Sequence, residues 1–376
     1  MRLVRDMEFL QATAVLVGAM VGVGIFGIPF AFAKAGFWLG MAWLVVLAVV
    51  TAVFTTVYAR LVEATPGLHQ VTGYATMWLG AWGRRVSTLA QLVGSYGALL
   101  AYMIIAGGFL HNVLSQVIAI TPTWYALGFV MFWSLAIVGS VRSIAAFELV
   151  LVSLYTIVIF GIFIVGFKHV SLSQLTPVTW EFWHLPYGVL MFAFSGIAAV
   201  PIQYSILRAR PHLMSRSISI AVGLVALLYA LFAFTVVGIS GDITSPEAFS
   251  GLYEALGPSV VMVGSLLGIL TISTSFVMLG TALFETFSLD YRIARPVAWA
   301  LTIAPPIGLF LSGLRNAIDV IGLAGGVAIG LQCIVIVLAF FAMTRAVGQA
   351  TSWLHRCAYL LVGLFAVGIV TQYWMP

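Results

Sequence analysis

The residues with the clearest chemical potential lie in a glycine-rich stretch, Gly18 to Pro29, inside an apolar run near the N-terminus. Glycine costs about 1 kcal/mol and proline about 3 kcal/mol in a helix interior, so this stretch predicts a broken helix. At a break, the following half-helix exposes amides with partial positive charge and the preceding half exposes carbonyls with partial negative charge. The amides expected to bind a carboxylate are those around Val23, Gly24 and Ile25, and the carbonyls expected to face a cation are those of Gly18 and Val21. Close helix packing by small residues is the alternative, and it accounts for Gly18 and Gly22 only.

A hydroxyl-rich stretch offers oxygen ligands for the same cation. Thr271, Thr274 and Ser275 are three and four residues apart, so they share one helix face. Their oxygens would suit a hard monovalent cation, although such hydroxyls often bond to their own backbone instead. Tyr102 lies near the middle of another apolar run, where its phenol could donate to a substrate carboxylate or bond across helices. The sequence leaves both alternatives open.

The composition indicates a membrane protein, so transmembrane helices must position these groups. Hydrophobic residues make up 62% of the 376 residues and charged residues 7%, whereas soluble domains carry about 25% charge. Apolar runs of about 20 residues recur along the chain, and each is long enough to cross a bilayer as a helix. The cations form no basic stripe, which argues against nucleic acid as a partner. Cys333 and Cys357 are too sparse for a disulfide framework or a metal site, and we interpret both as packing residues.

The apolar runs predict an all-α polytopic protein with about eleven transmembrane helices in a single domain, residues 1–376. The expected spans are residues 9–33, 38–62, 88–114, 122–140, 145–167, 184–206, 216–239, 258–286, 295–312, 317–343 and 353–374. With a cytoplasmic N-terminus, every Lys and Arg falls inside except Lys34, Lys168 and Arg315. This is the distribution that the positive-inside rule predicts, and it places the C-terminus outside. The inner segment between spans two and three is long enough for a short surface helix.

The sixth run repeats the interruption of the first. Phe192 to Gly196, followed by Pro201, places small residues and a proline in the middle of a span. Spans one and six therefore begin two five-span units of opposite orientation, residues 9–167 and 184–343, and residues 353–374 add an eleventh span. Interrupted spans at corresponding positions of inverted repeats indicate a transporter site at the membrane midplane.

Ionisable side chains inside a span are candidates for function by default. Glu285 lies toward the inner end of span eight, near Arg292 and Arg295, so an ion pair or a gate latch is a better interpretation than a proton relay. No lysine lies within the core of a span. The sequence also lacks the motifs of intramembrane enzymes, such as His-Glu-x-x-His and Gly-x-Ser-x-Gly, so no catalytic residue, catalytic metal or cofactor beyond a bound Na+ is predicted.

The motifs themselves resemble the amino acid/auxin permease family. Residues 18–37, GAMVGVGIFGIPFAFAKAGF, are similar to the first-span signature of that family, and Phe192 to Pro201 resembles its sixth span. Tyr96-Gly97 with Ala101-Tyr102 resembles the third span of the family. Thr274-Ser275-Phe276 followed by Leu283-Phe284-Glu285 resembles a pattern found in the bacterial aromatic amino acid and serine permeases of the family. The resemblance implies a five-plus-five inverted-repeat fold like that of the leucine transporter, with one added helix.

The resemblance also implies secondary active transport of an amino acid. The substrate would contact Gly22, Val23, Gly24, Ile25, Tyr102, Phe194, Ser195 and Gly196, and the cation would lie among Gly18, Val21, Thr271, Thr274 and Ser275. The sequence therefore predicts a multi-pass symporter of the inner membrane that imports a neutral amino acid with Na+ or H+. The alternatives are transport of a nucleobase, polyamine or organic cation on the same fold, and, less favoured, an ion channel. The sequence does not indicate which amino acid is carried, the coupling stoichiometry or the oligomeric state.

Overall fold

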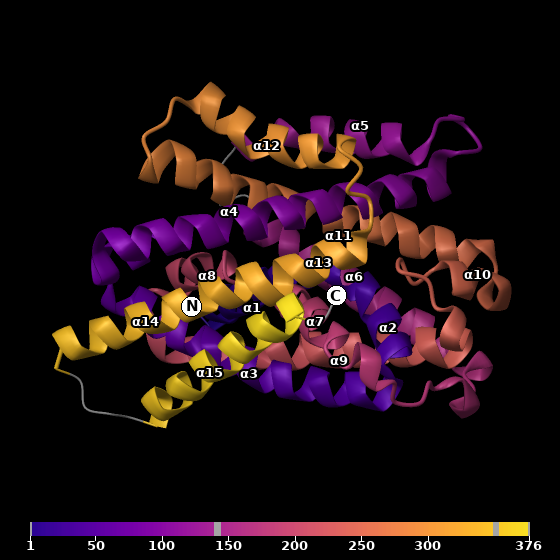
Figure 1. The fold of residues 1–376 in the computed structure, drawn as a ribbon, viewed down its shortest axis with the longest axis horizontal. Coiled ribbons are helices and arrows are strands. Elements are labelled where there is room, and N and C mark those ends of the chain that lie inside the picture. Colours follow the sequence, from indigo (N-terminus) through magenta and orange to yellow (C-terminus); the bar gives the residue numbers. More distant parts are fainter. Residues whose placement is uncertain (1, 139–143, 349–352, 375–376) are drawn as a thin grey trace.

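A computed structural model of the chain describes residues 2–138, 144–348 and 353–374 (Figure 1). Within these residues every regular element is helical, in agreement with the predicted fold class. The helices are α1 (Arg2–Met20), α2 (Gly24–Ala35), α3 (Phe37–Ala64), α4 (Val71–Leu114), α5 (Pro122–Ser134), α6 (Ile144–Gly166), α7 (Leu185–Ala193), α8 (Ala199–Leu207), α9 (Met214–Ser240), α10 (Ser250–Leu256), α11 (Pro258–Glu285), α12 (Arg295–Leu311), α13 (Ala317–Leu323), α14 (Gly330–Ala346) and α15 (Trp353–Trp374). The π-helical segment η9 (Ala324–Ile329) joins α13 to α14.

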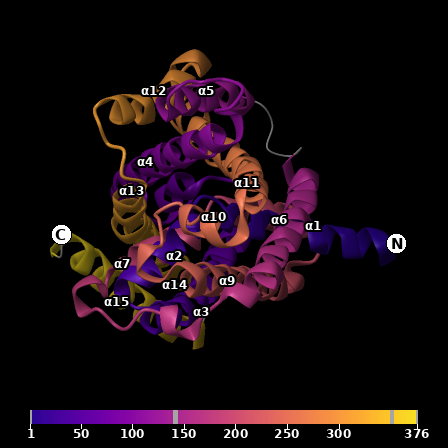
Figure 2. The same ribbon diagram turned by 90° about the vertical axis from the view of Figure 1, so that its right-hand side faces the viewer.

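Membrane spans follow from the length and apolar character of these helices. Seven of the described helical stretches are long and apolar enough to cross a bilayer, and α1 with α2, bent by 52° at their break, makes an eighth. Two shorter apolar stretches, Pro122–Val138 and Arg295–Leu311, lie between them. Helices α3, α4 and α14 run along the long axis of the molecule, whereas α1 and α6 cross it (Figures 1 and 2). The chain is therefore a multi-pass helical membrane protein.

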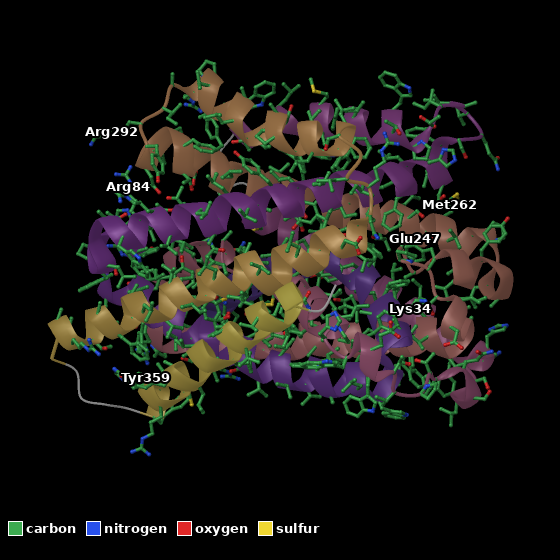
Figure 3. All side chains as sticks on the ribbon, viewed as in Figure 1. Lys34, Arg84, Glu247, Met262, Arg292 and Tyr359 are labelled. Carbon is green, nitrogen blue, oxygen red and sulfur yellow. The ribbon has the colours of Figure 1, made fainter. Side chains whose placement is uncertain are left out.

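Four charged residues mark the two ends of the helical bundle. Arg84 and Arg292 lie at one end, and Lys34 and Glu247 lie toward the other (Figure 3). We refer to these as the Arg84 end and the Lys34 end. The segregation of the two labelled arginines from Lys34 is that expected from the sequence.

Two groups of helices enclose the centre. The broken helices α1/α2 and α7/α8 pack together with α3 and α9, whereas α4 packs with α5, α11, α12 and α14. Both ribbon views show α5 and α12 together on one side and α3 and α9 on the opposite side (Figures 1 and 2). The interface between the two groups passes through the breaks in the first and sixth predicted spans.

The segment before the third predicted span is helical, as expected for a surface helix. It is continuous with that span, because α4 begins at Val71 and bends at Gly80. Gly80 has φ 68° and ψ −151°, a conformation that favours glycine. A Cβ at Gly80 would meet no atom within 4 Å, so the backbone conformation alone requires glycine at the bend.

Candidate functional site

The first span breaks where the sequence places the break. Helix α1 ends at Met20 and α2 begins at Gly24. The Gly22 amide donates to the Met20 carbonyl at 2.8 Å, which leaves the Gly18 carbonyl without the partner that a continuous helix would supply. The break therefore exposes carbonyls at the end of α1.

The opposite side of this break exposes amides. Val23 caps α2 with helical backbone angles and no side-chain hydrogen bond. Among the described residues, no backbone carbonyl accepts from the amides of Val23, Gly24 or Ile25. Unpaired amides at a helix N-terminus attract anions. The start of α2 thus has the chemistry predicted for a carboxylate site.

The second break meets the first directly. Helix α7 ends at Ala193, and α8 begins at Ala199. A Cβ built on Gly24 would lie 2.6 Å from Cα of Ala193, so only glycine permits this approach. The interrupted segments of the two predicted repeats are therefore in contact with each other.

A tyrosine that the sequence analysis did not select links both breaks. The fully buried Tyr229 hydroxyl of α9 lies 2.7 Å from the Met20 carbonyl and 2.8 Å from the Ala193 carbonyl. It donates its single proton to this pair of carbonyls, which end α1 and α7. A polar side chain in the middle of an apolar run, at the depth of the breaks, is the sequence signal that could have identified it.

A cavity of about 80 Å³ lies at the meeting point of the two helix groups. Its polar lining comes from the breaks and from α4, α11 and α14. The predicted site residues in its wall are Gly22, Val23, Gly24, Tyr102, Ser195 and Ser275. The wall contains no Asp, Glu, Lys, Arg or His among the described residues. A ligand here would meet main-chain dipoles, hydroxyls and amides, with no charged side chain.

Three residues predicted to contact substrate lie outside this cavity. Ile25 lines a separate small cavity. Phe194 packs against the Tyr229 ring, with centroids 5.2 Å apart. Gly196 faces α1, where a Cβ would lie 2.7 Å from the Leu16 side chain. Phe192, next to the sixth-span break, lines the cavity instead.

The residues of the predicted cation site lie around the first break but do not all share one cavity. Val21 and Thr271 line a cavity of about 30 Å³, whereas Ser275 lines the larger one. The Thr274 hydroxyl donates to the Thr271 carbonyl at 3.1 Å, a bond within the helix of the kind expected for hydroxyl-rich spans. Gly18 lines neither cavity. Helix α11 therefore brings Thr271 and Ser275 to the break, on two sides of it.

Aromatic rings close the Lys34 end of the site. Phe26, in the first turn of α2, packs against Phe109 with ring centroids 4.8 Å apart and against Phe249 at 5.6 Å. Tyr102 and Phe192 face each other beside the cavity at 6.4 Å. This packing separates the cavity from the Lys34 end of the bundle.

Polar side chains line the other end of the cavity. Gln70 and Gln91 are part of its wall. The Gln70 amide donates to a Glu285 carboxylate oxygen at 3.2 Å, and Gln91 donates to the Thr286 hydroxyl at 2.9 Å. The cavity therefore extends toward the Arg84 end along a polar path.

The expectation of an ion pair at Glu285 is wrong. Arg295 donates to the Val138 carbonyl at 3.1 Å, and Glu285 is bonded to Gln70. The segment between α3 and α4 passes next to the end of α11, which the sequence separation of the two does not reveal. The gate-latch interpretation retains a structural basis, with a neutral amide as the partner.

Comparison with known proteins decides the family. The profile of the family described as "Transmembrane amino acid transporter protein" matches residues 5–287, more than half of the chain. The chain belongs to this family. The resemblance to the amino acid/auxin permeases is thereby confirmed.

Three relatives of this transporter carry the name "uncharacterized transporter", one from Mycobacterium bovis and two from Mycobacterium tuberculosis. Each is 27% identical over 288 residues, which are 74% of this chain and 62% of the relative. The aligned part of the transporter thus spans less than two thirds of the length of these relatives.

A solved structure shares the fold. The crystal structure of MhsT in complex with L-phenylalanine matches with a TM-score of 0.72 and covers 97% of this chain and 98% of that one. The two sequences are 14% identical, so the likeness concerns the fold alone. It extends over nearly the whole chain.

Proposed function

We propose that this transporter imports a neutral amino acid together with a cation. The observation that carries the proposal is the set of unpaired amides at Val23, Gly24 and Ile25, two of which border a cavity without charged side chains. A helix N-terminus of this kind favours a carboxylate. The uncharged wall favours a substrate whose remaining groups carry no net charge, because an unpaired buried charge is costly.

The two breaks supply the remaining contacts for the amino acid backbone. Carbonyls at the ends of α1 and α7 suit its ammonium group, and the Tyr102 hydroxyl borders the cavity next to Gly22. The proposed substrate contacts in the cavity wall are Gly22, Val23, Gly24, Tyr102 and Ser195. Ile25 contributes its amide, and Phe194 and Gly196 support the second break from outside the cavity.

The proposed cation, Na+ or H+, crosses with the substrate. For Na+, the ligands are oxygens near the first break, from Gly18, Val21, Thr271, Thr274 and Ser275. One positive charge moving inward gains about 2.3 kcal/mol per 100 mV of membrane potential. That energy corresponds to more than tenfold accumulation of the substrate.

The arrangement of helices supports alternating access in a bacterial inner membrane. We propose eleven spans with the N-terminus and the Arg84 end in the cytoplasm and the C-terminus outside, with inverted repeats over residues 9–167 and 184–343. The group formed by α1/α2, α3, α7/α8 and α9 would rock against the group around α4.

Reconstitution tests the proposal. Proteoliposomes containing the purified protein should accumulate at least one neutral amino acid when an inward Na+ or H+ gradient is imposed, and an ionophore that dissipates the gradient should abolish accumulation. Absence of gradient-driven uptake across a complete panel of amino acids would refute the proposed function. Single-channel currents far above transporter turnover would instead favour a channel.

A further inference from the structure

The cavity wall contains polar side chains without partners. Ser95 and Gln332 line the cavity and are 4% and 9% exposed, yet neither side chain forms a hydrogen bond with the described residues. The Ser275 hydroxyl, assigned above to the cation site, lies beside the Tyr102 hydroxyl. Buried polar groups are normally hydrogen-bonded, so two unpaired side chains in a single cavity indicate a missing ligand or water.

Two other polar side chains of the same cavity are already bonded. Gln91 accepts from the Thr72 hydroxyl at 3.0 Å and donates to Thr286, and Gln70 donates to Glu285. Lack of a partner therefore distinguishes Ser95 and Gln332 from the two glutamines at the other end of the cavity. Ser95 and Gln332 extend from α4 and α14, away from the two breaks, whose main-chain groups suffice for a carboxylate and an ammonium group.

We infer that the substrate has an uncharged polar side chain that carries a hydroxyl or a carboxamide. This inference rests on the proposed function. A hydroxyl or carboxamide both donates and accepts, so it can pair with the Ser95 hydroxyl and the Gln332 amide. An aliphatic side chain would bury these groups without partners and bind more weakly.

The composition of the wall limits the substrate further. A charged side chain would find no counterion in the wall, because the described lining residues are uncharged.

Pairs of amino acids with the same shape provide the sharpest test. Threonine and valine differ by a hydroxyl in place of a methyl group, and asparagine and leucine differ by a carboxamide in place of an isopropyl group. Initial uptake of each labelled amino acid into proteoliposomes, at equal low concentration, should be at least about tenfold faster for threonine than for valine, and likewise for asparagine over leucine. Equal or faster uptake of valine and leucine would overturn the inference and leave the proposed function intact. Failure of every amino acid to enter would overturn the proposed function itself.

Two variants show whether the named side chains cause the preference. Ser95→Ala and Gln332→Leu should lower the threonine-to-valine ratio of uptake severalfold while valine uptake persists. Ser87→Ala is the matched control, because Ser87 is buried two turns away on α4, bonds to the Arg84 carbonyl and does not line the cavity. Thermal unfolding of each purified variant verifies folding. Unchanged ratios in both folded variants would overturn the inference and indicate that water satisfies these groups.

Discussion

Gly24 and Ala193 bring the two broken helices into contact, with a Cβ at position 24 falling 2.6 Å from the Ala193 Cα. Each residue lies at the end of a half-helix, Gly24 at the start of α2 and Ala193 at the end of α7. The contact is between backbones, so it depends on the absence of a side chain. Geometry at the site therefore depends on this glycine.

Gly24→Ala is expected to lower amino acid uptake at least tenfold, because the added methyl group pushes apart the breaks that bind substrate. Overpacking of this kind destabilises a folded protein by about 1–3 kcal/mol, so the thermal midpoint should also fall. Proteoliposome uptake and thermal unfolding measure the two effects. Gly223→Ala on α9 is the control, because its Cβ would meet nothing within 4 Å. Equal uptake by both variants would show that the breaks tolerate separation.

Tyr229→Phe removes the hydroxyl that links the ends of α1 and α7. Its loss leaves the Met20 and Ala193 carbonyls without this donor, which should cost about 1–3 kcal/mol of stability. Because these carbonyls end the two half-helices at the site, we also expect a higher KM with a smaller change in kcat. Kinetics of uptake and thermal unfolding provide the measurements.

Tyr96→Phe is the matched control for that variant. Tyr96 also donates to a carbonyl, that of Leu301 at 2.7 Å, but at a half-buried position on α4 that does not line the cavity. It should retain the KM of the unmodified transporter. A wild-type KM for Tyr229→Phe would mean that the breaks keep their geometry without the hydroxyl.

The double variant Thr274→Ala with Ser275→Ala tests the cation site. If oxygens near the first break bind Na+, the Na+ concentration for half-maximal uptake should rise at least about tenfold, as expected for losing 1.4 kcal/mol or more of binding. Ser273→Ala is the control, because this buried hydroxyl bonds to the Ile269 carbonyl of its own helix and lines neither cavity. Na+ dependence that survives the double substitution would remove these hydroxyls from the proposed site.

Glu285→Gln tests whether this carboxylate carries protons. Glutamine keeps an oxygen that can accept from Gln70, so we expect uptake and its pH profile to remain close to those of the unmodified transporter. Glu285→Ala removes the acceptor and should change uptake by loosening the contact between α11 and the segment before α4. Loss of proton-driven uptake in Glu285→Gln alone would identify Glu285 as a proton carrier.

The sequence predicts the elements better than their mutual arrangement. Both broken spans can be predicted from glycine and proline inside apolar runs, because these residues disfavour a helical conformation whatever the run packs against. Tyr229 and Gln332 were missed, because their roles depend on which face of α9 and α14 meets the breaks. Apolar spans show little amphipathic pattern, so their sequence does not show which face of the helix points toward the centre of the bundle.

The error at Glu285 has a similar origin. Arg292 and Arg295 are near it in sequence, whereas Gln70 is 215 residues away and becomes its partner through the fold. The charged residues nearest in sequence do not predict the partner of a side chain at a helix end when a segment from another part of the chain covers that end.

The cavity is closed by different forces at its two ends. Opening toward the Lys34 end must separate Phe26 from Phe109 and Phe249, whereas opening toward the Arg84 end must break the bond between Gln70 and Glu285. Hydrophobic contacts weaken on cooling and strengthen in sulfate or phosphate salts, and a bond between two polar side chains does not share this dependence. Temperature and salt type therefore act on the two closures unequally, and cooling favours separation of the aromatic rings over release of the polar contact.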